Sequence, residues 1–210
     1  DESNQTYVFY FEALINDMVS SSESVIEYWT VSGSEFIGSS GNTATSSLNM
    51  LINDFVYYYE KGFRANKIGI PAGRWSSINP QNVEAVYKQD ISKALAMEAL
   101  LACKNFFMGN HFGDAEVTGE GLYDYLAYLD DTNYSDSEMF VGLEDDIIQA
   151  FDNSMQKIEL LNDNFFAQIN TDHFKMLAAF DAIQVGVVRL KTNMMSILGI
   201  SVDYFDADGD

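Results

Sequence analysis

The sequence has 210 residues, of which 47% are hydrophobic and 14% aromatic, and a formal net charge of −21 at pH 7. A chain of this length and hydrophobicity can bury a core, which excludes a disordered acidic tail. The pI near 4.1 argues against nucleic acid and anionic lipid as partners, because both are bound through basic surfaces.

The single cysteine, Cys103, excludes an internal disulfide and any zinc or iron–sulfur site that needs several thiolates. Cys103 lies in an apolar helical segment, so we interpret it as a small core residue rather than a nucleophile. No apolar run is long enough to cross a bilayer. The sequence starts at Asp1 without a Met or a signal peptide, and we expect a chain that is processed, trimmed or part of something longer.

Hydrophobic residues recur with a period close to 3.6 along most of the chain, and alternating strand patterns are missing. A first helix is expected over residues 5–29, and a flexible Gly/Ser-rich link over residues 31–42. The apolar stripe of this first helix consists of Phe11, Ile15, Met18, Val25 and Trp29.

A second helix is expected to start at a Thr43 or Thr45 cap. It should end near Lys67, because Gly69 and Pro71 cannot continue it. An irregular connection then follows.

Shorter helices occupy the middle of the chain. Pro80 is expected to open a short helix that ends near Tyr87, and Asp90 to cap a helix over residues 91–107. A glycine-broken loop then leads to a short helix around residues 122–129.

Two long helices complete the pattern. The first is expected over residues 138–166, and the second from a cap at Thr171 and Asp172 to Gly199. Four long helices with shorter ones and no strand predict an all-α, antiparallel four-helix-bundle-like domain over residues 1–210.

Basic residues concentrate at one helix end, in the segment from Glu60 to Gly73. No Lys or Arg precedes Lys61, and seven of the eleven basic residues lie between positions 61 and 104. Two interpretations stay open. Glu60 and Arg64 form an i,i+4 pair, and cations at a helix C-terminus complement its dipole. Alternatively, a positive pocket beneath the Gly-Ile-Pro-Ala-Gly turn receives a carboxylate from a partner or ligand.

Histidines and acidic residues give little support for a metal site. Glycines bracket His111 in the sequence Gly-Asn-His-Phe-Gly-Asp, and His111 with Asp114 falls short of a complete ligand shell. We predict a loop histidine, with these two residues as the only candidate ligands, and interpret His173 as a helix-start residue. The acidic run from Asp206 lacks the spacing of a calcium-binding EF-hand and predicts a solvated tail.

The sequence shows no base–nucleophile pair by spacing, no glycine-rich phosphate loop and no HExxH zinc motif. These residues favour a binding or structural bundle over an enzyme that works alone.

Several segments in chain order resemble the C-terminal half of imelysin-like proteins. The most specific is the core Arg-x-x-Lys-Ile-Gly-x-Pro-x-Gly, which runs from Arg64 to Gly73. The segments are residues 59–73, 82–87, 90–93, 106–113, 168–171 and 201–210.

The resemblance implies an all-α protein of the bacterial cell envelope, often a lipoprotein, grouped with iron-regulated protein A and nominally with metallopeptidases. Such proteins hold two bundle halves with a functional site in the cleft between them. The Gly-x-His-x-x-Glu signature of the family belongs to the N-terminal half, and His111 is not its equivalent. The residues implied to face the cleft from the C-terminal half, which we take as binding residues, are Glu60, Arg64, Lys67, Gly69, Pro71, Gly73, Glu84 and Ser92.

Three functions follow as expectations. The favoured one is a non-catalytic envelope binding module, linked to iron or metal uptake, whose partner is the missing N-terminal half or a second envelope protein. No cofactor is predicted beyond a divalent metal or iron that such a role would involve. The alternatives are a metal-dependent peptidase with its signature residues outside this chain, and an acidic structural or adhesion bundle.

Overall fold

The computed structural model describes residues 2–41, 43–111, 113, 117–132, 138 and 140–204. Every named element within these residues is helical, and the β-structure among them is one isolated bridge between Asn110 and Thr118. The all-α prediction is therefore confirmed. The chain divides into two compact units, Asp1–Leu48 and Asn49–Asp210, which we describe separately. The expectation of a single domain over residues 1–210 stays a prediction.

The first unit is dominated by one helix, α1 (Glu2–Gly38). The predicted flexible link is wrong for residues 31–38, which continue the helix. Ring contact across two turns accompanies this extension, since the Trp29 and Phe36 centroids lie 5.0 Å apart at an interplanar angle of 73°. In addition, the Thr30 hydroxyl donates to the Ile26 carbonyl at 2.8 Å, which satisfies a polar group that would otherwise compete with the helix backbone.

The second unit opens with a continuous helix in three parts. α2 (Ser47–Tyr57) passes into the π-helical segment η1 (Tyr58–Gly69) and then into α3 (Ile70–Ala72). The predicted end near Lys67 is wrong. The Ile70 N–H donates to the Ala65 carbonyl, five residues back, and this wider turn gives the ring of Pro71 room.

The middle of the chain is less helical than expected. The short helix predicted from Pro80 to Tyr87 is only the 3₁₀ turn η2 (Pro80–Asn82). A second 3₁₀ turn, η3 (Gln89–Ile91), leads into α4 (Ser92–Met108). Asp90 does not cap α4 as predicted, because its carboxylate accepts from Lys88 Nζ at 2.8 Å.

The next two helices are α5 (Leu122–Asp131), as expected, and α6 (Leu143–Glu159), which is shorter at both ends than the predicted 138–166. Gly142, with φ at 65°, precedes α6 and fixes its start, since its N–H donates to Asp130 Oδ2 at 2.9 Å.

α7 (Phe165–Val187) consists of two helical stretches joined at a kink, and the first of them, which starts at Phe165, was not expected as a separate helix. The Asn164 side chain caps the helix by accepting from the Ala167 N–H at 2.9 Å. The second stretch begins after the kink at Asp172, which has φ −160° and ψ 80°, so it starts where the sequence predicts the last long helix to start. The helix continues as η4 (Val188–Met194) and α8 (Met195–Ile197).

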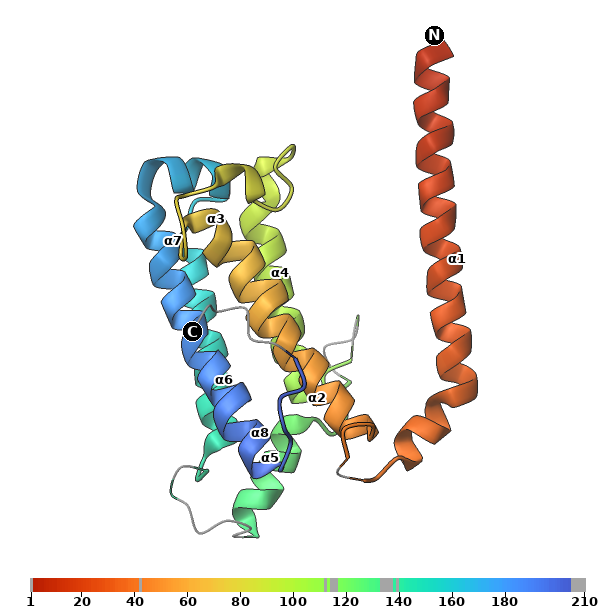
Figure 1. Cartoon of the computed structure of the whole chain (residues 1–210), viewed down its shortest axis with the longest axis vertical. Coiled ribbons are helices and arrows are strands. Elements are labelled where there is room, and N and C mark those ends of the chain that lie inside the picture. The colour runs from red at the N-terminus through yellow and green to blue at the C-terminus, as the bar shows by residue number, and fades with distance from the viewer. Residues whose placement is uncertain are drawn as a thin grey trace. The chain divides into compact units, whose positions relative to one another are not determined.

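Four helical segments of the second unit lie side by side: α2 with η1, α4, α6, and α7 with η4 (Figure 1). η1 packs against α4 and α7, and α6 packs against the same two helices, so the four surround one core. The largest enclosed apolar side chains are Tyr59, Phe63, Phe107, Phe151, Phe165 and Phe180.

The segment after α8 is tied back to α2. Asn53 Nδ2 donates to the Ser201 carbonyl at 3.1 Å, and Asn53 Oδ1 accepts from the Asp203 N–H at 3.1 Å. Gly199, with φ at 65°, lies where the sequence predicts the last helix to end. Among the helices of the described residues, none combines the length and the apolar character that crossing a bilayer requires.

Candidate functional site

A buried polar cluster centred on Glu60 joins η1 to η4. Glu60 Oε2 accepts from Lys191 Nζ at 2.9 Å and from the Tyr204 hydroxyl at 2.8 Å. Its other oxygen, Oε1, lies 3.4 Å from Arg64 Nη2. Since Glu60 is only 3% exposed, its negative charge is held inside the fold by two cations and a phenol.

Arg64 is 2% exposed, and its guanidinium lies within the helical core. Nη1 donates to Gln184 Oε1, and Cζ stands 4.7 Å from the centroid of the Phe180 ring. The Arg64 guanidinium thus contacts three groups of the same chain. Its charge faces the Glu60 carboxylate, its N–H edge donates to Gln184, and its flat face lies over the Phe180 ring. These contacts favour the intramolecular interpretation of the cationic segment over a solvent-open pocket for a carboxylate.

Lys67, Glu84 and Ser92 form a second group in the same region, in which Glu84 is exposed, Lys67 is partly buried and Ser92 is buried. Lys67 Nζ pairs with Glu84 Oε2, and the Ser92 hydroxyl donates to the Glu84 carbonyl at 3.3 Å. The Glu84 side chain is 41% exposed, so this ion pair is open to solvent. Its main effect is to hold the connection before α4 against η1.

Gly69 allows the helix to approach α7 closely. A Cβ at this position would lie 2.7 Å from Phe180 Cε2 and 2.9 Å from Trp75 Cζ3. At Gly73 the reason for glycine is the backbone, because φ is 80° and a Cβ would meet the Ile78 nitrogen at 2.7 Å.

The carbonyl of the buried Pro71 accepts from the Asn79 N–H at 2.9 Å, so the Gly-Ile-Pro-Ala-Gly turn is closed by hydrogen bonds as well as by shape.

The structure therefore brings together Glu60 with Arg64, and Lys67 with Glu84 and Ser92. The glycines and the proline shape the backbone between these two groups. That these residues also face a cleft shared with another bundle half stays a prediction.

Sequence reasoning missed the residues that α7 and η4 contribute to the cluster. Phe180, Gln184 and Lys191 fall on one helix face, at i, i+4 and i+11. A polar Gln and a Lys aligned with a core Phe on an otherwise apolar helix were the available signal. Tyr204, in contrast, lies in the irregular segment after α8 and gave no periodic signal.

Of the two candidate metal ligands, the structure describes His111. His111 is an exposed loop residue, as predicted, and its N–H donates to the Val117 carbonyl at 3.0 Å. Asp114 and the acidic run from Asp206 lie outside the described residues. Within the described residues, no group of three or more His, Cys, Asp or Glu side chains is arranged to hold a metal ion.

His173 lies beside the Phe174 ring and directly follows the non-helical Asp172, so it starts the second helical stretch of α7, as predicted. Cys103 is buried, as expected of a core residue, and burial raises the pKa of its thiol to about 12. The thiol is therefore protonated and unreactive at neutral pH.

α1 carries an apolar stripe that a single helix cannot bury by itself. The side chains of the stripe are between 48% and 69% exposed, and the helix has acidic residues but no Lys or Arg. The stripe consists of Phe11, Ile15, Met18, Val25 and Trp29, all within one side of the helix. A surface of this kind is typical of a helix that packs against other helices.

No protein-family model matches this sequence, and neither the curated proteins nor the solved structures give a match. The imelysin-like resemblance thus rests on the sequence segments quoted above.

Proposed function

We propose that this chain is a non-catalytic, imelysin-like binding module of the cell envelope that works with a second helical body, the N-terminal bundle half. The observation that carries the proposal is the apolar stripe of α1, which spans a helix of 37 residues and is exposed when that helix is taken by itself. The link to iron or metal uptake comes from the imelysin-like resemblance.

Two features of α1 suit a helical partner. The stripe recurs at helical spacing over five turns, from Phe11 to Trp29, as expected of a surface that packs along another helix. α1 also carries acidic side chains, among them Glu12, Asp17 and Glu23, and it has no Lys or Arg. A partner with basic residues beside its apolar face would therefore be favoured over a second copy of this acidic chain.

The polar cluster around Glu60 would support a binding role by making the second unit rigid. It would not itself contact the partner. Its groups are joined to one another across η1, η4 and the segment that follows α8. This cluster fixes the geometry of the second unit, so any surface of that unit which meets a partner in addition to the α1 stripe would be preorganised.

The test is association of the purified chain with the separately expressed N-terminal bundle half, followed by size-exclusion chromatography and calorimetry. We expect a stable complex. Met18→Glu places a charge in the middle of the α1 stripe and should weaken binding by about 10-fold or more, because an unpaired charge would be desolvated at the interface.

The matched control is Ser20→Glu, which adds the same charge on the opposite face of α1 and should leave binding unchanged. Failure of the two halves to associate would overturn the proposal. Equal effects of the two variants would also contradict it, because the stripe would then have no special role.

A second candidate, an acidic structural or adhesion bundle, is favoured by the contacts of the cationic segment. Arg64 meets Glu60 and Gln184, and Lys67 meets Glu84, so these cations already serve the fold. This candidate predicts that the chain is fully stable and monomeric without any helical partner, and the same chromatography distinguishes the two.

A further inference from the structure

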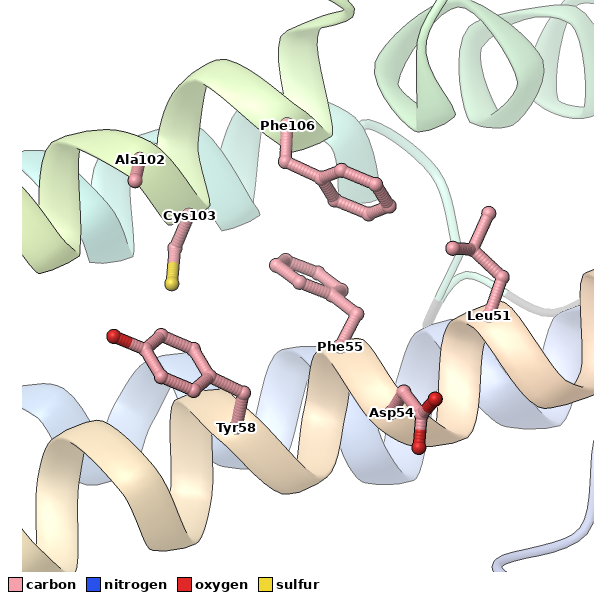
Figure 2. A pocket seen from close by; sticks show the side chains of 7 residues that line it. All are labelled: Leu51, Asp54, Phe55, Tyr58, Ala102, Cys103 and Phe106. Atoms are coloured by element: carbon pink, nitrogen blue, oxygen red, sulfur yellow. The ribbon is translucent and has the colours of Figure 1, made fainter. Parts of the chain in front are cut away.

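An apolar pocket of about 290 Å³ lies between α2 with η1 on one side and α4 on the other (Figure 2). Phe55 and Phe106 project toward one another from the two helices, with ring centroids 4.8 Å apart and an interplanar angle of 41°. The Cys103 thiol points into the same space, and the Tyr58 ring closes one end. All these residues belong to the second unit.

The polar groups of this pocket are acidic or neutral. Asp54 lies at the rim, with its carboxylate beside the helix rather than between the rings. It is exposed, and no described residue forms a hydrogen bond or ion pair with it. Burial, reinforced by Cys103 and Glu84, raises the pKa of Tyr58, so its phenol stays neutral at physiological pH. No Lys, Arg or His lines the pocket.

We propose that this pocket binds a small organic cation with a flat apolar body, of the arylalkylamine class. The apolar body would lie against the rings of Phe55, Phe106 and Tyr58, and the ammonium group would reach the Asp54 carboxylate at the rim. Aromatic faces attract cations through their quadrupoles, and the Asp54 carboxylate, which pairs with none of the described residues, supplies the opposite charge.

The volume of the pocket limits the size of the ligand, and the charge of its lining limits the charge of the ligand. Its volume is at the low end of the range for small-molecule sites and about twice that of a cavity that takes up benzene. A single ring with a short arm therefore fits better than a fused ring system. An anion is disfavoured, because the pocket offers it no cation and the chain carries a net charge of −21.

The experiment titrates the full chain with 2-phenylethylamine, with its neutral analogue 2-phenylethanol and with the anion 3-phenylpropionate, followed by NMR shifts and calorimetry. We expect the amine to bind with a Kd of about 1 mM or lower, the alcohol several-fold more weakly and the anion not at all. Asp54→Asn should weaken the amine about 5-fold and leave the alcohol unchanged.

Ala102→Phe tests the location, because Ala102 lines the pocket and is exposed on α4, so the added ring fills the pocket without disturbing the core. This variant should abolish binding of the amine. The matched control is Ala94→Phe, the same change at an exposed position of α4 outside the pocket, which should bind normally.

Unchanged binding in Ala102→Phe would overturn the site. Equal affinity for amine, alcohol and anion, with no effect of Asp54→Asn, would overturn the proposed preference for cations. Absence of amine binding in a correctly folded chain would overturn the proposal as a whole.

Discussion

Lys191 Nζ lies 2.9 Å from Glu60 Oε2, although 131 residues separate the two in sequence. This pair joins the helix that carries the cationic segment to the helix that faces it across the core. Both side chains are largely removed from water, since Lys191 is 16% exposed and Glu60 is 4% exposed at the side chain. A buried ion pair of this kind is costly to break from one side only.

Glu60→Gln should therefore be strongly destabilising. The change removes the charge that Arg64 and Lys191 share, and it leaves two cations in a poorly hydrated region. We expect a loss of about 3 kcal/mol in the free energy of unfolding, measured by urea denaturation. The control is Asp90→Asn, which breaks an exposed pair with Lys88 and should leave the urea midpoint unchanged. Equal midpoints for the two variants would contradict this account.

Gly69→Ala should destabilise the second unit, because the new methyl group would stand 2.7 Å from Phe180 and 2.9 Å from Trp75. Phe180 is buried and cannot move freely, so we expect a loss of about 1–3 kcal/mol by thermal or urea unfolding. In Gly33→Ala the methyl group meets nothing within 4 Å, and this variant should slightly raise helix content in circular dichroism. A stabilised Gly69→Ala protein would show that the contact with Phe180 relaxes without cost.

The Cys103 thiol should resist alkylation in the folded protein. Burial raises the pKa of the thiol to about 12, so almost no thiolate exists at pH 8. We expect labelling by iodoacetamide to be slow in buffer and fast in urea. Because the pKa is raised on folding, the stability gained from the buried neutral thiol is present below pH 9 and is lost as the pH rises toward 12. Rapid labelling of the native protein at pH 8 would refute this.

Glu144→Gln should stabilise the protein at neutral pH. Burial first, and the neighbouring carboxylates of Asp130, Asp145 and Asp131 second, raise the pKa of Glu144 above 4.5. A raised pKa means that the folded state favours the protonated form, so the ionised carboxylate opposes folding at pH 7. The melting temperature of the variant should exceed that of the wild type at pH 7, and the difference should vanish below pH 4.5. Glu98→Gln, at an exposed position of α4, should show no such gain.

Helix content could be predicted from the sequence because the apolar period of 3.6 persists through most of the chain. The positions of the helix ends were harder to predict than helix content. The errors in these positions share a physical cause. Pro71 would break a regular α-helix. The helix nevertheless continues to Pro71, because backbone N–H groups at the end of η1 donate to the carbonyl five residues back, as Ile70 does to Ala65. Nothing in local propensity signals that wider register, which depends on packing against α7.

Only part of the candidate site could be predicted from the sequence, for a similar reason. The pairing of Glu60 with Arg64 follows from their spacing, and the structure contains it. The contributions of Gln184 and Lys191 depend on how α7 and η4 face η1, which no local pattern encodes. The start of the last long helix after Asp172, in contrast, could be predicted from the local Thr171–Asp172 pattern.

The contact between Tyr204 and Glu60 sets a time order for folding in the cell. The two residues are 144 positions apart in the sequence. Asn53 likewise forms its hydrogen bonds with Ser201 and Asp203 only after those residues have been synthesised. At roughly 5–20 residues per second, a ribosome needs about 7 to 29 s to make that stretch. During this interval Glu60 lacks both Lys191 and Tyr204, so the nascent chain carries an incompletely neutralised carboxylate on an apolar helix. Chaperones that hold early helices apart would act in that window.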